Sequence, residues 1–144
     1  KPLSFEILDI DYFKQYNDRY GHQAGDDCVR AIAALIRQME SDQIFCARYG
    51  GDEFVIIYSG MSAEEVCERA EKLRQDVMAL QIEQRYTEGA FGVTISQGIC
   101  HDIPSNGNKN WDFLHVADQA LYRVKRRGRN RLCMTDIHGR EIEV

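Results

Sequence analysis

The chain has 144 residues, of which 44% are hydrophobic and 28% charged, values typical of one folded globular domain. Its formal net charge of −5 argues against nucleic acid as a partner, because duplex binding usually needs a basic face. The charge does not exclude a nucleotide, since a small phosphate ligand needs only a few local cations or a metal.

The cysteines and the apolar runs bear on the cellular compartment. No apolar run approaches the ~20 residues of a membrane span, and no signal peptide is visible. Five cysteines at broad spacing form no zinc knuckle or redox pair and are typical of reduced thiols: Cys28, Cys46, Cys67, Cys100 and Cys133. We therefore expect a cytoplasmic domain without direct membrane contact. Because the chain opens abruptly on an apolar segment, we expect a fragment, and any membrane anchor would lie in the missing N-terminal region.

One strand and two helices are predicted for the first part of the chain. The compact apolar run 3–8 predicts a strand, and residues 12–18 a short helix. A second helix is predicted to open at Gly25 and Asp26 and to end at Ser41 and Asp42. Its apolar positions fall on one helical face: Val29, Ile32, Ala33, Ile36 and Met39.

A hairpin and a third helix follow. Residues 44–49 and 54–58 are predicted strands on either side of Gly50 and Gly51, because glycine takes positive φ without penalty. Ser62 then begins a helix, with Glu65 completing a capping box. The apolar residues of that helix repeat at 3.6-residue spacing: Val66, Ala70, Leu73, Val77 and Leu80.

The last part of the chain predicts two strands around a helix. Residues 84–92 are polar and irregular, 93–99 predict a strand, and 104–110 a loop. A helix over 111–126 is predicted to end at Gly128. The final strand is 131–135, with 141–144 pairing beside it. We expect Trp111 in the core, together with the helix stripe Leu114, Ala117, Leu121 and Val124.

The order of these elements is β-α-α-β-β-α-β-α-β. A hairpin between helix crossovers predicts an α+β fold, an α/β sandwich in which helices flank a central mixed sheet. Its β-α-β-β-α-β part is the ferredoxin-like core, here with an extra helix and strands. We expect residues 1–144 to form a single domain.

Acidic residues occur where two of the predicted strands end. Asp9 and Asp11 leave the first strand on the same face, and Asp52 and Glu53 lie at the hairpin turn. Neighbouring strands lie ~4.8 Å apart, so these carboxylates meet around one ion if the first strand lies beside the hairpin. Hard oxygen ligands of this kind suit Mg²⁺. Taken singly, each piece is also typical of a solvated turn.

Several ordered blocks of the sequence resemble the GGDEF domain family. Residues 48–54, Arg-Tyr-Gly-Gly-Asp-Glu-Phe, resemble the signature for which the family is named. Upstream, 9–14, 17–18, 20–22 and 25–26 look like its nucleotide-binding stretch; downstream, 94–96, 117–122 and 125–130 are similar to its later blocks. The resemblance covers nearly the whole chain. It implies a fold similar to the palm of nucleotide cyclases and the activity of a diguanylate cyclase, which condenses two GTP into cyclic di-GMP and two pyrophosphates.

The resemblance also implies a metal site and a base. Asp9, the backbone carbonyl of Ile10, Asp52 and Glu53 would hold one or two Mg²⁺ or Mn²⁺ ions. Asp52 and Glu53 are the implied catalytic residues, with Asp52 taking the proton from the ribose 3′-hydroxyl. Two metals can stabilise the attacking and leaving oxygens of an in-line displacement.

For the guanine base, the resemblance implies Asn17 and Asp26. The chemistry fits, because guanine N1–H and N2–H donate to a carboxylate while O6 and N3 accept from an amide. Without the other blocks, Asn17 would be expected to cap a helix end and Asp26 to be the N-cap of the second helix.

The remaining implied contacts are with the phosphates and the nucleotide backbone. Lys14, Lys125 and Arg129 would contact the β- and γ-phosphates, although a basic helix end also favours the helix dipole. His22 matches a position near the substrate and is otherwise a turn residue. Gly50 and Gly51 would let the backbone approach the nucleotide.

The implied partners follow from the reaction. They are GTP, a second copy of the domain in a transient or signal-driven homodimer, and an upstream sensor domain in the full-length protein.

Three departures from the family pattern are visible. The helix and the Asp-x-Leu-Thr-Gly-Leu-x-Asn-Arg stretch before the first strand are missing. Gln97 stands where the family often has an apolar residue. The product-binding Arg-x-x-Asp motif is absent, because Ser41 and Ile44 occupy its positions, so weak product inhibition is expected.

Two other functions compete with an active cyclase. One is a catalytically silent GGDEF-like module that binds GTP or cyclic di-GMP and regulates a partner; such modules usually have a damaged signature, and this one is intact. The other is a different palm-like nucleotide cyclase or polymerase relative, against which the guanine-reading pair and the downstream blocks argue.

Overall fold

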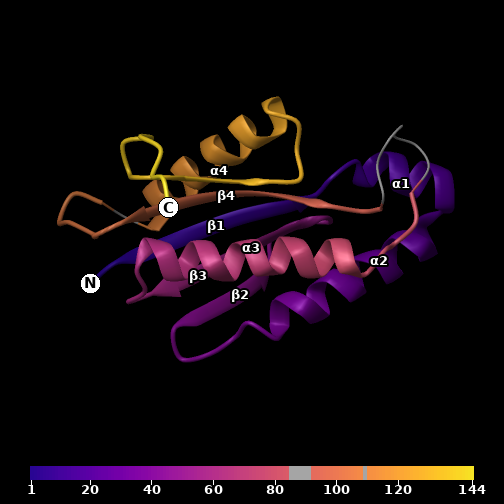
Figure 1. Ribbon diagram of the computed structural model, residues 1–144, viewed down its shortest axis with the longest axis horizontal. Helices are drawn as coiled ribbons and strands as arrows, with labels where there is room; N and C mark the ends of the chain where they lie inside the picture. The colour runs from indigo at the N-terminus through magenta and orange to yellow at the C-terminus, as the bar shows by residue number, and fades with distance from the viewer. Residues whose placement is uncertain (85–91, 109) are drawn as a thin grey trace.

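A computed structural model describes residues 1–84, 92–108 and 110–144 of the chain (Figure 1). The region predicted to be irregular, 84–92, falls almost entirely outside the described residues. In chain order the elements are β1 (Leu3–Ile10), α1 (Phe13–Tyr20), α2 (His22–Arg37), β2 (Ile44–Arg48), β3 (Glu53–Ser59), α3 (Ala63–Ala79), β4 (Ile95–Asp102), α4 (Asn110–Arg126) and β5 (Leu132–Thr135).

The strands form a mixed sheet in the order β2-β3-β1-β4-β5. β1 is antiparallel to both β3 and β4, β2 and β3 form the predicted hairpin, and β5 is parallel to β4. The first four strands therefore have the ferredoxin-like arrangement expected from the sequence. Beyond β5, Glu141 forms an isolated bridge with Thr135, so the expected pairing at the C-terminus is reduced to a single bridge.

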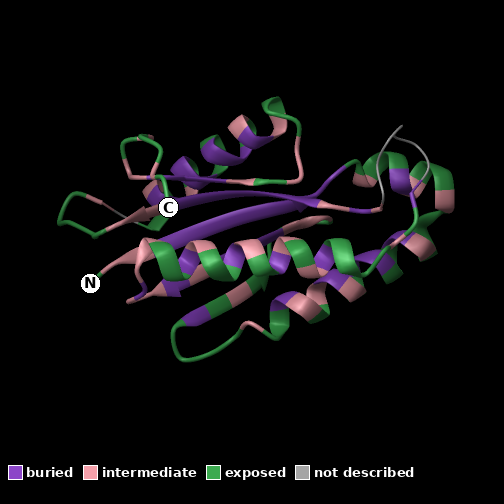
Figure 2. Cartoon of the chain, viewed as in Figure 1, coloured by how far each residue is buried: buried purple, intermediate pink, exposed green. Residues whose placement is uncertain are grey.

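Helices cover both faces of this sheet, as Figures 1 and 2 show. Strand side chains alternate between the two faces. Leu8, Ile56 and Ile99 face the cluster formed with α2 and α3, whereas Phe5 and Ile7 face Phe113 and its neighbours on α4. The sheet is thus the middle of three layers.

Gly98 lets α4 lie directly on β4. A Cβ at this position would come within 2.2 Å of the Leu121 backbone nitrogen and 2.3 Å of the Ala117 carbonyl oxygen. Any side chain would force the helix away from the sheet. The C-terminal end of α4, which carries Lys125, is therefore held close to the strands.

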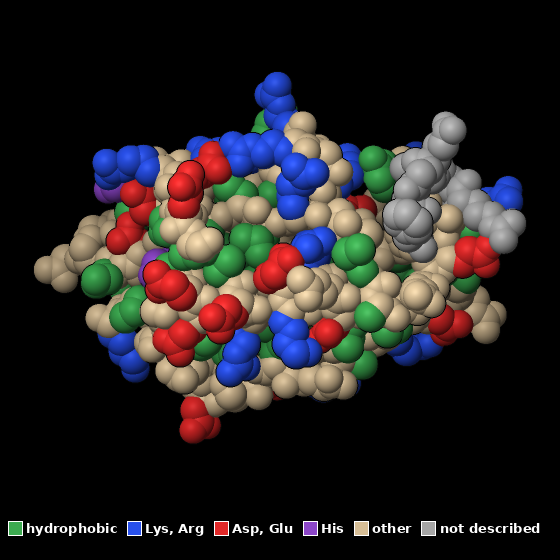
Figure 3. Space-filling model, viewed as in Figure 1, with side chains coloured by type: hydrophobic (Ala, Val, Ile, Leu, Met, Phe, Trp, Pro, Cys, Tyr) green, Lys and Arg blue, Asp and Glu red, His purple; other side chains and the backbone are tan. Residues whose placement is uncertain are grey.

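The third helix begins as the sequence predicts. The Ser62 hydroxyl accepts from the Glu65 backbone nitrogen at 3.2 Å, and the Glu65 carboxylate accepts from the Ser62 nitrogen at 3.0 Å. Further along, Arg74 and Lys72 pair with acidic residues of the same helix. Figure 3 shows acidic and basic side chains interspersed over this side of the molecule.

Two sequence predictions about helices are wrong. The second helix opens at His22, not at Gly25, because Gly21 makes the turn at φ 92° and accepts from the Gly25 nitrogen. Asp26 is therefore inside the helix and is not its N-cap. Trp111 is 67% exposed, because it lies about 200° around α4 from Phe113, which begins the buried stripe.

Gln97, unexplained at the sequence level, belongs to a buried polar cluster. Its amide donates to a Glu6 carboxylate oxygen and to the Ala70 carbonyl, both at 2.9 Å. The Tyr58 hydroxyl donates to the other Glu6 oxygen at 2.6 Å. Glu6 lies on β1 with no exposed surface, and burial raises its pKa to about 7. Gln97 therefore satisfies a buried acid in the middle of the sheet.

Among the described helices, none combines the length and the apolar character that crossing a bilayer requires.

Candidate active site

The acidic residues where β1 ends and β3 begins lie together at one end of these two interior strands. Asp9 is the direct cross-strand partner of Glu53, and the Ile10 nitrogen donates to the Asp52 carbonyl at 3.1 Å. The antiparallel pairing of β1 and β3 thus brings together the four residues that the sequence singled out for metal and catalysis.

Asp9 is the most constrained of these acids. Its side chain is buried, one carboxylate oxygen pairs with the Lys125 ammonium, and the other has no hydrogen-bond partner among the described residues. Burial raises the Asp9 pKa to about 6; the Lys125 charge opposes this rise, and the nearby Asp11 and Asp52 charges add to it. Such a carboxylate gains from any added cation.

This donor set suits a divalent cation only in part. The described residues contain no group of three His, Cys, Asp or Glu side chains arranged to hold an ion. The unpartnered Asp9 oxygen and the neighbouring Asp52 are nevertheless hard oxygen donors. Mg²⁺ is commonly bound through one or two carboxylates and completed by substrate phosphates and water, so the residues fit an ion that arrives with its nucleotide.

Asp11 has a different role from Asp9. Its carboxylate accepts from the Thr94 and Ser96 hydroxyls at 2.7 and 2.6 Å, and from the Asn130 nitrogen at 3.1 Å. With its oxygens occupied by protein donors, Asp11 ties β1 to β4 and to the loop after α4.

The hairpin turn between β2 and β3 is braced by Arg48. The Glu53 carbonyl accepts from the nitrogens of Tyr49 and Gly50. The Arg48 guanidinium donates to the Gly50 carbonyl at 3.1 Å and to the Gly51 carbonyl at 2.6 Å. Sequence reasoning gave Arg48 no role, although it is the first residue of the block 48–54. It holds the turn that carries Asp52.

Asn17 and Gly25 form the contact between α1 and α2. A Cβ on Gly25 would lie 1.8 Å from the Asn17 Oδ1, so only glycine leaves room for this amide. Asn17 Oδ1 is buried without a hydrogen-bond partner in the described part of the chain. Asp26 follows Gly25 directly, and both Asp26 and His22 are exposed on the first turns of α2. The two residues predicted to read guanine thus lie on adjoining helices.

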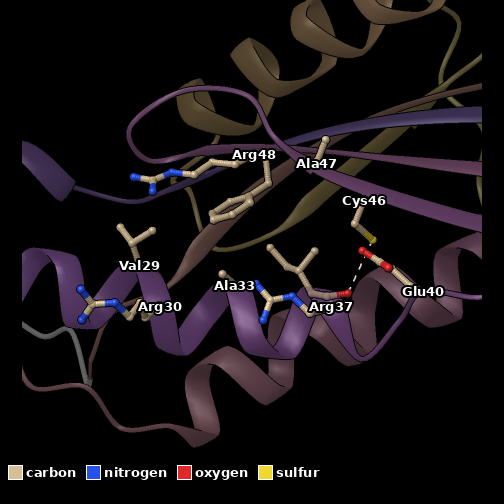
Figure 4. Close-up of a pocket in the computed structure, with 10 residues that line it drawn as sticks. Val29, Arg30, Ala33, Arg37, Glu40, Cys46, Ala47 and Arg48 are labelled. Atoms are coloured by element: carbon tan, nitrogen blue, oxygen red, sulfur yellow. Dashed lines mark hydrogen bonds between the residues drawn. The ribbon is translucent and has the colours of Figure 1, made fainter.

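A groove runs between α2 and the hairpin (Figure 4). Val29 and Arg30, one turn after Asp26, line it from the helix, and Arg48 and Phe54 line it from the strands. Arg37 and Glu40 lie further along the groove. The Cys46 thiol donates to the Ile36 carbonyl at 3.5 Å on its floor. The groove connects the helix turn that carries Asp26 with the side chain that braces Gly50 and Gly51.

The predicted phosphate contacts lie in different surroundings. Lys14 is exposed on α1, whereas Lys125 is engaged with Asp9. Arg129 follows the end of α4 at φ 65°, and its guanidinium lies 4.8 Å from the centre of the Tyr12 ring. Lys125 and Arg129 are thus both directed to the end of β1, and the roles of all three cations stay predictions.

Comparison with known families gives one match over most of the chain. The family described as "Diguanylate cyclase, GGDEF domain" matches residues 1–131. A protein named diguanylate cyclase from Vibrio cholerae is 36% identical over 140 residues, 93% of this chain and 40% of its own length. Diguanylate cyclase A from Treponema denticola is 36% identical over 136 residues, 94% of this chain and 36% of its length. The chain thus spans well under half of these relatives.

Solved structures show the same fold. The GGDEF domain of DgcB from Caulobacter crescentus, in complex with c-di-GMP, superposes with a TM-score of 0.81 at 36% identity, covering 95% of this chain and 78% of that one. The active GGEEF domain of a diguanylate cyclase from Vibrio cholerae superposes with a TM-score of 0.76 at 35% identity, covering 93% and 83%.

Proposed function

This chain belongs to the GGDEF family of diguanylate cyclase domains, and we propose that it condenses two GTP molecules into cyclic di-GMP and two pyrophosphates. The observation that carries the proposal is the meeting of Asp9, Asp52 and Glu53 where β1 pairs with β3. Lys125 pairs with Asp9 at the same end of these strands, so acidic and cationic groups lie close together there.

The reaction requires a base and charge neutralisation. The ribose 3′-oxygen of one GTP attacks the α-phosphorus of the other, a P–O bond forms, and the bond to pyrophosphate breaks. Asp52 takes the 3′-hydroxyl proton, and Glu53 supports it. Asp9, the Ile10 carbonyl, Asp52 and Glu53 would hold Mg²⁺ or Mn²⁺. When bound, such an ion neutralises charge developing on the phosphoryl oxygens.

Substrate choice is assigned to the contact between α1 and α2. Asp26 accepts from guanine N1–H and N2–H, and the Asn17 amide donates to O6 or N3. Adenine would leave the Asp26 carboxylate unpaired, which disfavours ATP by ~1–3 kcal/mol. His22 lies beside this pair, and Gly50 and Gly51 allow close approach of the nucleotide.

The triphosphate is assigned to three cations. Lys14, Lys125 and Arg129 bind the β- and γ-phosphates. Lys125 is paired with Asp9 in the free domain, so a metal that binds Asp9 would release the lysine toward the phosphates. The same pair keeps Asp9 partly neutralised until substrate arrives.

We further propose that the domain acts in the cytoplasm, as one of two copies in a homodimer and under a sensor domain outside this chain. Each copy contributes one nucleotide site, so the two copies must face each other for both phosphodiester bonds to form. All five cysteines are free thiols, which is in keeping with that compartment.

The test is incubation of the purified domain with GTP and MgCl₂, followed by chromatography of the products. We expect cyclic di-GMP and pyrophosphate in a 1:2 ratio, and no such product from ATP. GTP binding without turnover at any protein concentration would instead favour the silent regulatory module. A linear guanylate product would favour a different palm-like nucleotidyltransferase.

A further inference from the structure

The loop after α4 has an unusual backbone. Gly128, Arg129 and Asn130 have φ angles of 111°, 65° and 49°. Two consecutive non-glycine residues in the left-handed region are uncommon, and such a conformation persists only when its surroundings hold it. Arg129, one of the predicted phosphate ligands, is one of these two residues.

Hydrogen bonds hold Arg129 and Asn130 in this loop. The Arg129 nitrogen donates to the Val124 carbonyl at 3.1 Å. The Asn130 nitrogen donates to Asp11 at 3.1 Å and to the Ser96 hydroxyl at 3.2 Å. These contacts attach the loop to the end of α4, to β1 and to β4.

A further contact comes from Arg74 on α3, across the sheet from α4. Its Nη1 donates to the Asn130 side-chain oxygen at 2.9 Å and to the Asn130 carbonyl at 3.3 Å. Its Nε and Nη2 donate to the two Glu71 oxygens at 2.8 and 2.6 Å. The Arg74 side chain is only 17% exposed, so its planar fork is oriented by Glu71 and directed at Asn130.

The hydrogen bonds from Arg74 to Asn130 bear on Arg129, the residue before Asn130. Its guanidinium stacks over Tyr12, in the turn that follows the metal-site end of β1. In the described part of the chain, no acidic side chain lies within ion-pair distance of it. Arg129 is thus a cation held in place and available to an anion at the end of β1.

We infer that Arg74 is a positioning residue of the phosphate site: by holding Asn130, it keeps Arg129 in the left-handed conformation that directs its guanidinium to the β- and γ-phosphates of a nucleoside triphosphate. The inference rests on the proposed function. Arg74 touches no substrate, and its effect passes through the loop.

The experiment compares binding of a non-hydrolysable GTP analogue with binding of GMP by calorimetry. GMP shares the guanine contacts but does not reach Arg129. The variants are Arg74→Met and Arg74→Lys, with Lys72→Met as the control, because it also removes one cation from α3, and Lys72 forms its ion pair with Asp76 of the same helix. Urea unfolding reports the folded fraction of each variant.

We expect Arg74→Met to weaken binding of the triphosphate analogue by ~10-fold or more, as for loss of hydrogen bonds that involve a charged group. Its affinity for GMP should be unchanged. Arg74→Lys should bind the analogue with an affinity between those of the wild type and Arg74→Met, since lysine keeps the charge but lacks the forked guanidinium. Lys72→Met should bind as wild type.

Three results would overturn the inference. They are an equal loss for GMP and the analogue, unchanged binding by Arg74→Met, and full retention by Arg74→Lys, which would assign the effect to charge alone. Wild-type protein that binds neither nucleotide would instead contradict the proposed function, and with it the inference.

Discussion

At the scale of single residues, three neighbouring carboxylates differ through their partners. Asp11 is surrounded by three protein donors. Asp9 is buried with one lysine and one unpartnered oxygen. Asp52 lies half-buried at the turn that Arg48 braces. Of the three, Asp52 alone combines partial access to solvent with a place in a hydrogen-bonded turn, which suits its proposed role as the base for a substrate hydroxyl.

The first prediction concerns Asp52. Asp52→Asn keeps the size of the side chain but removes its charge and basicity, so cyclic di-GMP synthesis should fall by at least ~100-fold. Initial rates by chromatography check this, with Asp42→Asn, in an exposed turn, as the control. Near-normal synthesis by Asp52→Asn would remove it from the catalytic role.

The second prediction concerns Gly25. Gly25→Ala places a methyl group on the Asn17 amide, so Asn17 must move and its proposed contact with guanine should be lost. The preference for GTP over ATP should fall ~3- to 10-fold, the worth of one neutral hydrogen bond. Competition binding measures it, and Gly107→Ala is the control because a Cβ there meets nothing within 4 Å. Unchanged selectivity with a displaced Asn17 would show that Asn17 does not read the base.

At the scale of elements, the sheet contains a carboxyl group that is completely buried. Glu6 on β1 is hydrogen-bonded by Tyr58 of β3 and Gln97 of β4, and Gln97 continues to the Ala70 carbonyl of α3. One polar cluster therefore links three central strands and the helix that covers them. No cation pairs with Glu6 among the described residues, so its neutral form is favoured.

The third prediction is a pH dependence of stability. Burial raises the Glu6 pKa from 4.5 to about 7, so the folded state binds this proton more tightly than the unfolded chain. The stability from this group is complete below about 4.5 and is lost as the pH rises through about 7. Glu6→Gln mimics the neutral acid and should gain stability relative to wild type between pH 5 and 8, on the order of 3 kcal/mol.

Urea unfolding at several pH values measures that difference. Glu68→Gln, on the exposed face of α3, is the matched control. A constant difference between Glu6→Gln and wild type from pH 5 to 8 would mean that Glu6 does not titrate in this range.

The turn between α2 and β2 bears on product inhibition. The Ser41 and Ile44 backbones hydrogen-bond each other at 3.1 and 3.4 Å, the Ser41 hydroxyl accepts from the Gln43 nitrogen, and Ile44 is 3% exposed. At the positions where the resemblance places a product-binding arginine and aspartate, Ser41 therefore supplies no cation, and the side chain of the buried Ile44 supplies no hydrogen-bond acceptor.

The fourth prediction follows from this turn. Cyclic di-GMP should inhibit only weakly, and only by competing with GTP, so added GTP should abolish the inhibition. Titration of the product at several GTP concentrations checks this. Tight noncompetitive inhibition that is lost on substitution of residues 41–44 would reveal a product site there.

At the scale of the whole molecule, one chain has one signature turn and one predicted nucleotide site. The proposed product contains two GMP units, so the proposed reaction requires two copies to bring their sites together, and a C2 arrangement satisfies that geometry.

The fifth prediction is that specific activity rises with protein concentration. Initial rates over a wide dilution series, with the mass of the species followed by light scattering, measure it. Constant specific activity in a protein that stays monomeric would contradict a two-copy reaction. A tandem fusion of two domains should remove the concentration dependence.

Local chemistry was enough to predict much of this protein. The strand order along the chain, the hairpin at Gly50 and Gly51, the Ser62 capping box and the acids at two strand ends all follow from patterns within a few residues. The ferredoxin-like core could be predicted from their order, whereas the meeting of Asp9 with Glu53 depended on the first strand lying beside the hairpin, which only the structure shows.

Tertiary contacts decided the rest. Gly25 is a weak helix former and suggested a helix start, but it lies inside α2 because α1 packs against it. Trp111 is apolar yet faces solvent, because α4 turns its other side to the sheet. Gln97 donates a hydrogen bond to Glu6, and Arg74 donates one to Asn130, 56 residues away along the chain. Such pairings depend on which elements lie side by side, and the hydrophobic pattern within one element does not predict its neighbours.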